Sequence, residues 1–144
     1  MLNVGELRDG IVLDHIKAGR GMSIYHDLGL HKLDCSVAII KNAHSNKMGR
    51  KDMIKIEGII DLDMDVLGYI DHDITINIIR NGVITEKRSI DLPKRVTNVI
   101  KCKNPRCITS IEQELDHVFE LSEEEGEVYR CIYCGEESHY KLRK

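Results

Sequence analysis

The chain has 144 residues, of which 42% are hydrophobic, 31% charged and 4% aromatic, and its formal net charge is −3. This composition is typical of a folded protein rather than a disordered one, and the length suits one ordinary domain or two small ones. No apolar run approaches the ~20 residues that a membrane-spanning helix needs. The N-terminus also lacks the pattern of a signal peptide, so we expect a cytoplasmic protein.

The first hundred residues alternate between short strands and helices. Five runs rich in isoleucine and valine are predicted strands: residues 11–16, 35–41, 51–57, 73–79 and 83–87. Helices are predicted within residues 19–29 and after Asp61 or Asp63, either of which can cap a helix N-terminus. Residues 42–49 have the composition of a turn, and Asn81-Gly82 favours a tight hairpin. This order predicts an α+β fold, the ferredoxin-like split βαβ arrangement with an antiparallel sheet and one additional strand.

A boundary between two domains is predicted at Pro93 and the basic residues that follow it. We therefore expect a first domain over residues 1–95 and a second over residues 96–144. The second segment is too short for a large apolar core, and a domain of that size generally needs a disulfide or a metal ion to stabilise it.

Four of the five cysteines form two close pairs in this second segment. They are spaced C-x4-C-x23-C-x2-C and comprise Cys102, Cys107, Cys131 and Cys134. Two turns with converging thiolates suit tetrahedral Zn²⁺, and four thiolates leave no position open for a catalytic water. Disulfides are the alternative that a cytosolic location disfavours, and His117 or His139 could replace a cysteine ligand. The spacing predicts one structural zinc ion, and we expect the segment to be a small all-β domain that the ion stabilises.

Polar residues of the first domain could collect on one side of its sheet. They are Asp14 and His15 at the end of the first strand, Lys51 and Lys55 on the third, and Asn77 and Lys87 on the last two. Ammonium groups and a histidine suit a polyphosphate, and a carboxylate can accept from a ribose hydroxyl. No glycine-rich phosphate loop is present in the sequence. The residues alone therefore allow either a nucleotide site or a solvated surface.

Several short sequence segments, taken together with the cysteine spacing, form a highly specific pattern. They are residues 12–16, residues 48–57, residues 75–77, Leu92-Pro93 and Asn98-Val99. In these features the chain resembles the regulatory chain of aspartate carbamoyltransferase over essentially its full length. The resemblance implies a non-catalytic subunit that forms homodimers through its N-terminal domain. Its zinc domain would dock on catalytic trimers, in a dodecamer of six catalytic and six regulatory chains that controls pyrimidine biosynthesis.

The same resemblance implies that CTP inhibits and ATP activates at one site in the first domain, with UTP reinforcing CTP. That site would use Asp14, His15, Lys55, Asn77 and Lys87, with Lys51 at its edge and backbone groups near Leu7 and Ile84. The four cysteines would hold the zinc ion, and Asn104 would face the catalytic chain.

Two other classes of protein are alternatives. A zinc-ribbon nucleic-acid binder is disfavoured by charge: residues 1–100 hold 14 basic and 14 acidic side chains, whereas residues 101–144 hold 7 and 10. A zinc hydrolase is disfavoured because four cysteines fill the coordination sphere. We therefore expect no nucleic-acid and no membrane partner.

Overall fold

Residues 7–125 and 127–138 are described by the computed structural model, and the chain divides into two compact units after Asp91. Both units are built on antiparallel sheets, which confirms the predicted α+β class. None of the helices in these residues is long and apolar enough to cross a membrane.

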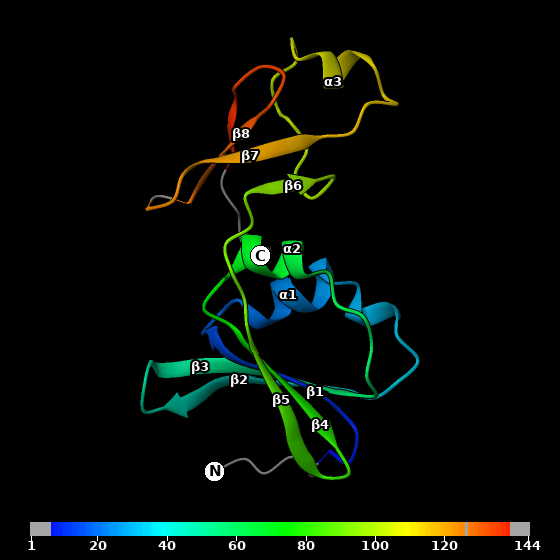
Figure 1. Cartoon of the computed structure of the whole chain (residues 1–144), viewed down its shortest axis with the longest axis vertical. Helices are drawn as coiled ribbons and strands as arrows, with labels where there is room; N and C mark the ends of the chain where they lie inside the picture. Colours follow the sequence, from blue (N-terminus) through cyan, green and yellow to red (C-terminus); the bar gives the residue numbers. More distant parts are fainter. Residues whose placement is uncertain (1–6, 126, 139–144) are drawn as a thin grey trace. The chain divides into compact units, whose positions relative to one another are not determined.

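The first unit is a five-stranded sheet with helices on one face (Figure 1). Its elements are β1 (Gly10–Lys17), α1 (Gly21–Asp27), the 3-10 turn η1 (Leu30–Lys32), β2 (Val37–Ser45), β3 (Gly49–Glu57), α2 (Met64–Ile70), β4 (Thr75–Arg80) and β5 (Val83–Ser89). The strand order is β2-β3-β1-β4-β5, and every neighbouring pair is antiparallel. This is the predicted split βαβ arrangement, with β5 as the additional strand.

The core of the first unit lies between the sheet and the helices. Alternate strand residues are buried on that face: Ile11, Leu13, Ile54, Ile56, Ile76 and Ile78. The helices contribute Ile24 from α1, and Leu67 and Ile70 from α2. Because strand side chains alternate between faces, the residues between these apolar positions face the opposite side of the sheet.

The prediction of a turn over residues 42–49 was wrong. Strand β2 continues to Ser45, so that only residues 46–48 form the turn before β3. The pairing of β2 with β3 shifts between Ile40 and Ala43, and Asn42 adopts φ 59° there. A bulge of this kind admits polar residues within a strand, which explains why a turn-like composition forms a strand here.

The start of α2 decides between the two caps considered above. The side chain of Asp63 accepts hydrogen bonds from the backbone N–H groups of Asp65 and Val66, at 3.1 and 3.2 Å. We expect Asp63→Ala to lower the free energy of unfolding by about 1 kcal/mol, because two helix N–H groups lose their acceptor. Chemical denaturation checks this, with Asp61→Ala as the control that should have little effect. Equal losses in both variants would contradict the assignment.

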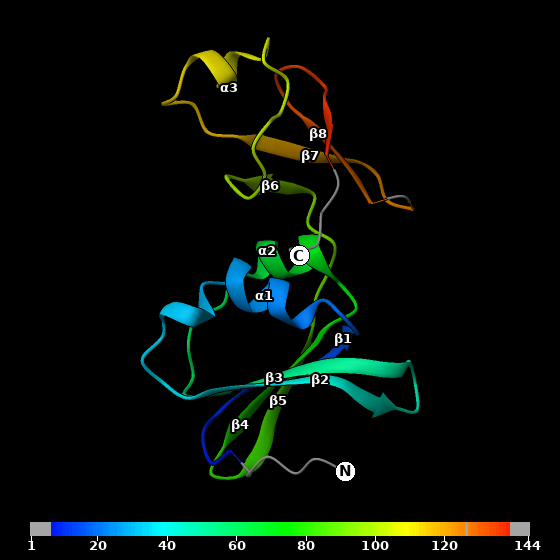
Figure 2. The ribbon, with the colours of Figure 1, turned by 180° about the vertical axis from the view of Figure 1, so that it is seen from behind.

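The second unit is a four-stranded sheet, seen from behind in Figure 2. Its elements are β6 (Arg95–Thr97), α3 (Ile108–Ile111), β7 (Val118–Glu123), β8 (Val128–Cys131) and β9 (Glu137–Ser138), with strand order β6-β7-β8-β9. Its small core contains Val96, Phe119 and Tyr129, and the Tyr129 hydroxyl donates to the Pro93 carbonyl at 2.5 Å. The β domain was predicted; the short turn α3 was not, since four residues are too few to show helical periodicity.

Candidate metal centre and nucleotide-binding face

The four cysteine sulfurs converge in the second unit. Cys102 and Cys134 place their Sγ atoms 3.5 Å apart, and Cys107 and Cys131 place theirs 3.7 Å apart. All four Sγ atoms lie within 4.8 Å of one another. Cys102 and Cys107 come from the loop that leads into α3, whereas Cys131 ends β8 and Cys134 lies in the turn that follows, so each close sulfur pair joins the two segments.

These separations fit a tetrahedral metal site. With Zn–S bonds of ~2.3 Å, the edges of a thiolate tetrahedron measure ~3.8 Å. A disulfide would instead bring two sulfurs to ~2.05 Å, and all four cysteines are free thiols here. Cys102, Cys107 and Cys131 are buried, whereas Cys134 lies at the surface. The structure therefore brings together the complete predicted ligand set.

Two further residues hold the ligands, and neither was predicted in that role. The Thr109 hydroxyl donates to Cys107 Sγ at 3.1 Å, and the Cys102 backbone N–H donates to His117 Nδ1 at 3.1 Å. His117 is thus an acceptor that supports the loop, not a member of the sulfur cluster. The prediction for His139 falls outside the described residues. No sequence signal marks either contact, because each depends on how the loop closes.

The environments of the four thiols differ. Burial raises the pKa of the Cys102 thiol to about 12 and also raises the pKa of Cys131. The hydroxyl of Thr109 lowers the pKa of the Cys107 thiol to about 7. Cys107 therefore presents a thiolate most readily at neutral pH, and metal binding must displace the protons of the buried thiols.

In the first unit, strand register forms a row of side chains across the sheet. Val12 of β1 pairs with Lys55 of β3 on one side and with Asn77 of β4 on the other, and Asn77 pairs with Lys87 of β5. Lys55 alternates with the buried Ile54 and Ile56, so this row lies on the face opposite the helices. The structure thus brings together three residues that were predicted to bind a nucleotide.

Three more candidates lie at the end of β1, where its pairing with β3 shifts between Leu13 and Ile16. Asp14 Oδ1 accepts from the His15 backbone N–H at 2.7 Å and lies 2.8 Å from Lys51 Nζ. His15 adopts φ 60°, and its Nδ1 lies 3.1 Å from Thr75 Oγ1. The irregular backbone therefore aims Asp14 and His15 toward neighbouring strands, which a regular alternation would not predict.

Several polar groups of this face lack a partner. Within the described part of the chain, Lys55 and Lys87 make no hydrogen bond or ion pair. Asn77 Oδ1 is buried and has no hydrogen-bond partner among the same residues. Buried polar atoms are nearly always satisfied by protein or solvent, so an unpaired amide oxygen beside two free ammonium groups fits a face that receives a polar ligand.

The remaining candidates occupy the edges of this face and the second unit. Near Leu7, the Arg8 carbonyl accepts from the Gly82 N–H at 2.8 Å, which ties the start of the described chain to the β4–β5 hairpin. Ile84 follows that hairpin, pairs with Ile79 and is exposed. Asn104 lies in the first cysteine loop, where its Oδ1 accepts from the Arg106 N–H at 3.0 Å.

Comparison with known proteins matches both units. The family model described as aspartate carbamoyltransferase regulatory chain, allosteric domain, matches residues 2–91, and that described as its metal binding domain matches residues 94–142. Proteins with the name "Aspartate carbamoyltransferase regulatory chain" are similar throughout. The one from Clostridium botulinum is 54% identical over 136 residues, 94% of this chain and 93% of its own length. Those from Clostridium tetani and Bifidobacterium longum are 53% and 39% identical over 137 residues, covering 94% and 95% of this chain and 95% and 99% of their own.

Proposed function

Because this chain belongs to the family of aspartate carbamoyltransferase regulatory chains, with an allosteric and a metal-binding domain, we propose that it controls a catalytic chain by binding nucleotides. It is a regulatory rather than a catalytic subunit. The nucleotides are CTP and ATP, with UTP reinforcing CTP, and the process they control is pyrimidine biosynthesis in the cytoplasm.

The observation that supports nucleotide binding is the row formed by Lys55, Asn77 and Lys87. Two ammonium groups with no counterion among the described residues suit a triphosphate, since each supplies a compact charge and three donors. The unpaired Oδ1 of Asn77 can accept from a base amine or a ribose hydroxyl. His15 and the Asp14–Lys51 ion pair lie beside this row, two to three residues further along β1 from Val12, and would complete the polar site.

A second role belongs to the metal-binding domain, which would contact the catalytic chain. Four apolar side chains that lie within four residues of a cysteine ligand in the sequence are exposed: Ile108, Ile111, Ile132 and Tyr133. Ile111 alone is 65% exposed, and apolar residues that cluster at a surface are typical of a protein–protein interface. Asn104 lies in the same cysteine loop and would add a polar contact. Held in place by the metal, these residues form the docking surface.

The proposed assembly contains regulatory homodimers and catalytic trimers, six chains of each kind. The first unit would supply the homodimer contact, and the second unit the contact with the catalytic chain. Nucleotide binding can then regulate only if the nucleotide binds two quaternary states with different affinity, for which a coupling of about 1–3 kcal/mol is typical. Since a purine and a pyrimidine differ in width, CTP and ATP can share phosphate contacts and still favour opposite states.

Reconstitution tests this proposal directly. We expect the full-length chain to bind the catalytic trimer, measured by size-exclusion chromatography, and to make the carbamoyltransferase activity of the complex sensitive to CTP and ATP. The isolated catalytic trimer should show no such sensitivity. A complex whose activity is unchanged by both nucleotides would refute nucleotide control but would not contradict the docking role.

A further inference from the structure

The helix-facing side of β3 carries a buried carboxylate directly behind the nucleotide-binding face. Asp52 follows Lys51 in β3, so the two side chains point to opposite faces of the sheet. Lys51 is paired with Asp14 on the open face, whereas Asp52 is 0% exposed. In the pairing of β1 with β3, Lys17 lies opposite Lys51 and Ile16 opposite Asp52.

Asp52 binds three backbone N–H groups from two segments, the turn at the start of α1 and strand β2. Its Oδ2 accepts from the N–H groups of Gly19 and Gly21, at 3.1 and 2.9 Å, and its Oδ1 accepts from that of Asn42, at 2.8 Å. A Cβ added at Gly21 would lie 2.8 Å from Oδ2, so only glycine permits this approach. Because a buried carboxylate without donors is costly, the start of α1 must follow β3 when that strand moves.

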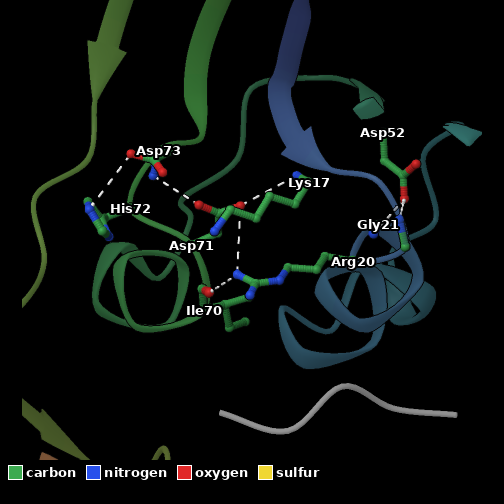
Figure 3. Close-up of polar contacts among 9 residues, drawn as sticks. Lys17, Arg20, Gly21, Asp52, Ile70, Asp71, His72 and Asp73 are labelled. Carbon is green, nitrogen blue, oxygen red and sulfur yellow. Dashed lines mark hydrogen bonds and ion pairs between the residues drawn. The ribbon is translucent and has the colours of Figure 1, made fainter. Parts of the chain in front are cut away.

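A second set of contacts joins α1 to the end of α2, and Figure 3 shows the Arg20 side chain reaching between the two helices. Arg20 Nη1 donates to the Ile70 carbonyl at 2.9 Å and lies 3.9 Å from Asp71 Oδ2. Asp71 is buried and also accepts from the N–H groups of Lys17 and Asp73, at 3.4 and 3.0 Å. The end of β1, the start of α1 and the end of α2 therefore share one polar network.

We propose that this network, from Asp52 through the start of α1 and Arg20 to Asp71, transmits the state of the nucleotide-binding face to the helical layer. The inference rests on the proposed nucleotide function and adds the contacts through which a bound nucleotide affects the helices. Lys51 and Asp52 are adjacent in one strand, so a ligand that displaces Lys51 from Asp14 also shifts Asp52. The amides of Gly19 and Gly21 follow that carboxylate, and Arg20 conveys the shift to the last turn of α2. Arg20 and Asp52 are positioning residues, since neither lies on the face that meets the nucleotide.

The decisive experiment separates nucleotide binding from nucleotide response. Arg20→Gln removes the contacts with Ile70 and Asp71 and leaves the open face of the sheet intact. In the full-length chain we expect its affinity for CTP, measured by calorimetry, to change by less than about twofold. In the complex with catalytic trimers, we expect the activity change caused by CTP or ATP to fall below about half of that of the wild type, since coupling is a property separate from affinity.

Three companion variants make the result specific. Arg88→Gln removes an equal charge from an exposed ion pair with Glu86 in the same unit, and should respond like the wild type. Arg20→Lys retains a cation that can donate to the Ile70 carbonyl, and should recover most of the response. Gly21→Ala displaces α1 from Asp52 by a different route, and should reproduce the Arg20→Gln result.

Each other outcome overturns the inference. A full response in Arg20→Gln would show that the network carries no signal. Parallel losses of melting temperature, CTP affinity and response would show that it only stabilises the fold, as would an equal loss of response in Arg88→Gln. A wild-type chain that binds neither CTP nor ATP would instead refute the proposed function, and with it the proposed role of the network.

Discussion

Removal of the metal is expected to unfold the second unit and abolish docking on the catalytic trimer, while the first unit stays folded. Binding of a structural zinc ion contributes about 10–16 kcal/mol at neutral pH, which is comparable to the total stability of about 5–15 kcal/mol of a typical domain. The apolar core of the second unit contains few side chains, chiefly Val96, Phe119 and Tyr129. Without the four metal–sulfur bonds, this core cannot offset the entropy of ordering the loops.

Cys107→Ala tests the same expectation without a chelator. Its sulfur is buried in the cluster, 3.7 Å from that of Cys131. We expect loss of stoichiometric zinc by elemental analysis and loss of the trimer complex by size-exclusion chromatography. Cys35→Ala is the matched control, because Cys35 is a free thiol of the first unit outside the cluster. A Cys107→Ala chain that still docks on the trimer would contradict a structural role for the metal.

The metal centre could be predicted because its signal is local. Two pairs of cysteines at short spacings restrict the chain to turns whose sulfurs converge, whatever the rest of the fold does. The position of the polar row on one face of the sheet could also be predicted, because it follows from regular alternation along the strands. Alternation within β3 separates Lys55 from Ile54 and Ile56, and the strand order then places Lys55, Asn77 and Lys87 in one row.

Contacts between distant segments could not be predicted in this way. The alternation that buries Ile54 and Ile56 also buries Asp52. A charged residue is not expected in the core from sequence alone, because the N–H groups that satisfy this carboxylate come from distant positions: Gly19, Gly21 and Asn42. The left-handed backbone conformation of Asn42 likewise depends on contacts between distant segments. It exists where β2 bulges, and there its N–H reaches the buried carboxylate. Such features require the tertiary structure, since no periodicity within one segment encodes them.

Replacement of Lys55 by alanine is expected to weaken CTP and ATP binding by about 10- to 150-fold, which corresponds to the loss of a charge-assisted hydrogen bond worth about 1.5–3 kcal/mol. Both nucleotides should be affected, because a lysine at the phosphates does not distinguish between bases. Lys87→Ala should behave alike, since Lys87 and Lys55 occupy the same row on either side of Val12 and Asn77. Isothermal titration of the full-length chain measures both effects.

The Lys55→Ala and Lys87→Ala variants are informative only if the stability and assembly of the chain stay unchanged. Lys55 and Lys87 make no hydrogen bond or ion pair with other described residues, so their removal should leave the melting temperature and the trimer complex intact. Lys32→Ala, at an exposed position of η1, removes the same charge on the helical side and should bind both nucleotides normally. If Lys32→Ala weakened binding as much as Lys55→Ala, the effect would reflect net charge rather than contact. The nucleotide would then bind elsewhere than on the open face of the sheet.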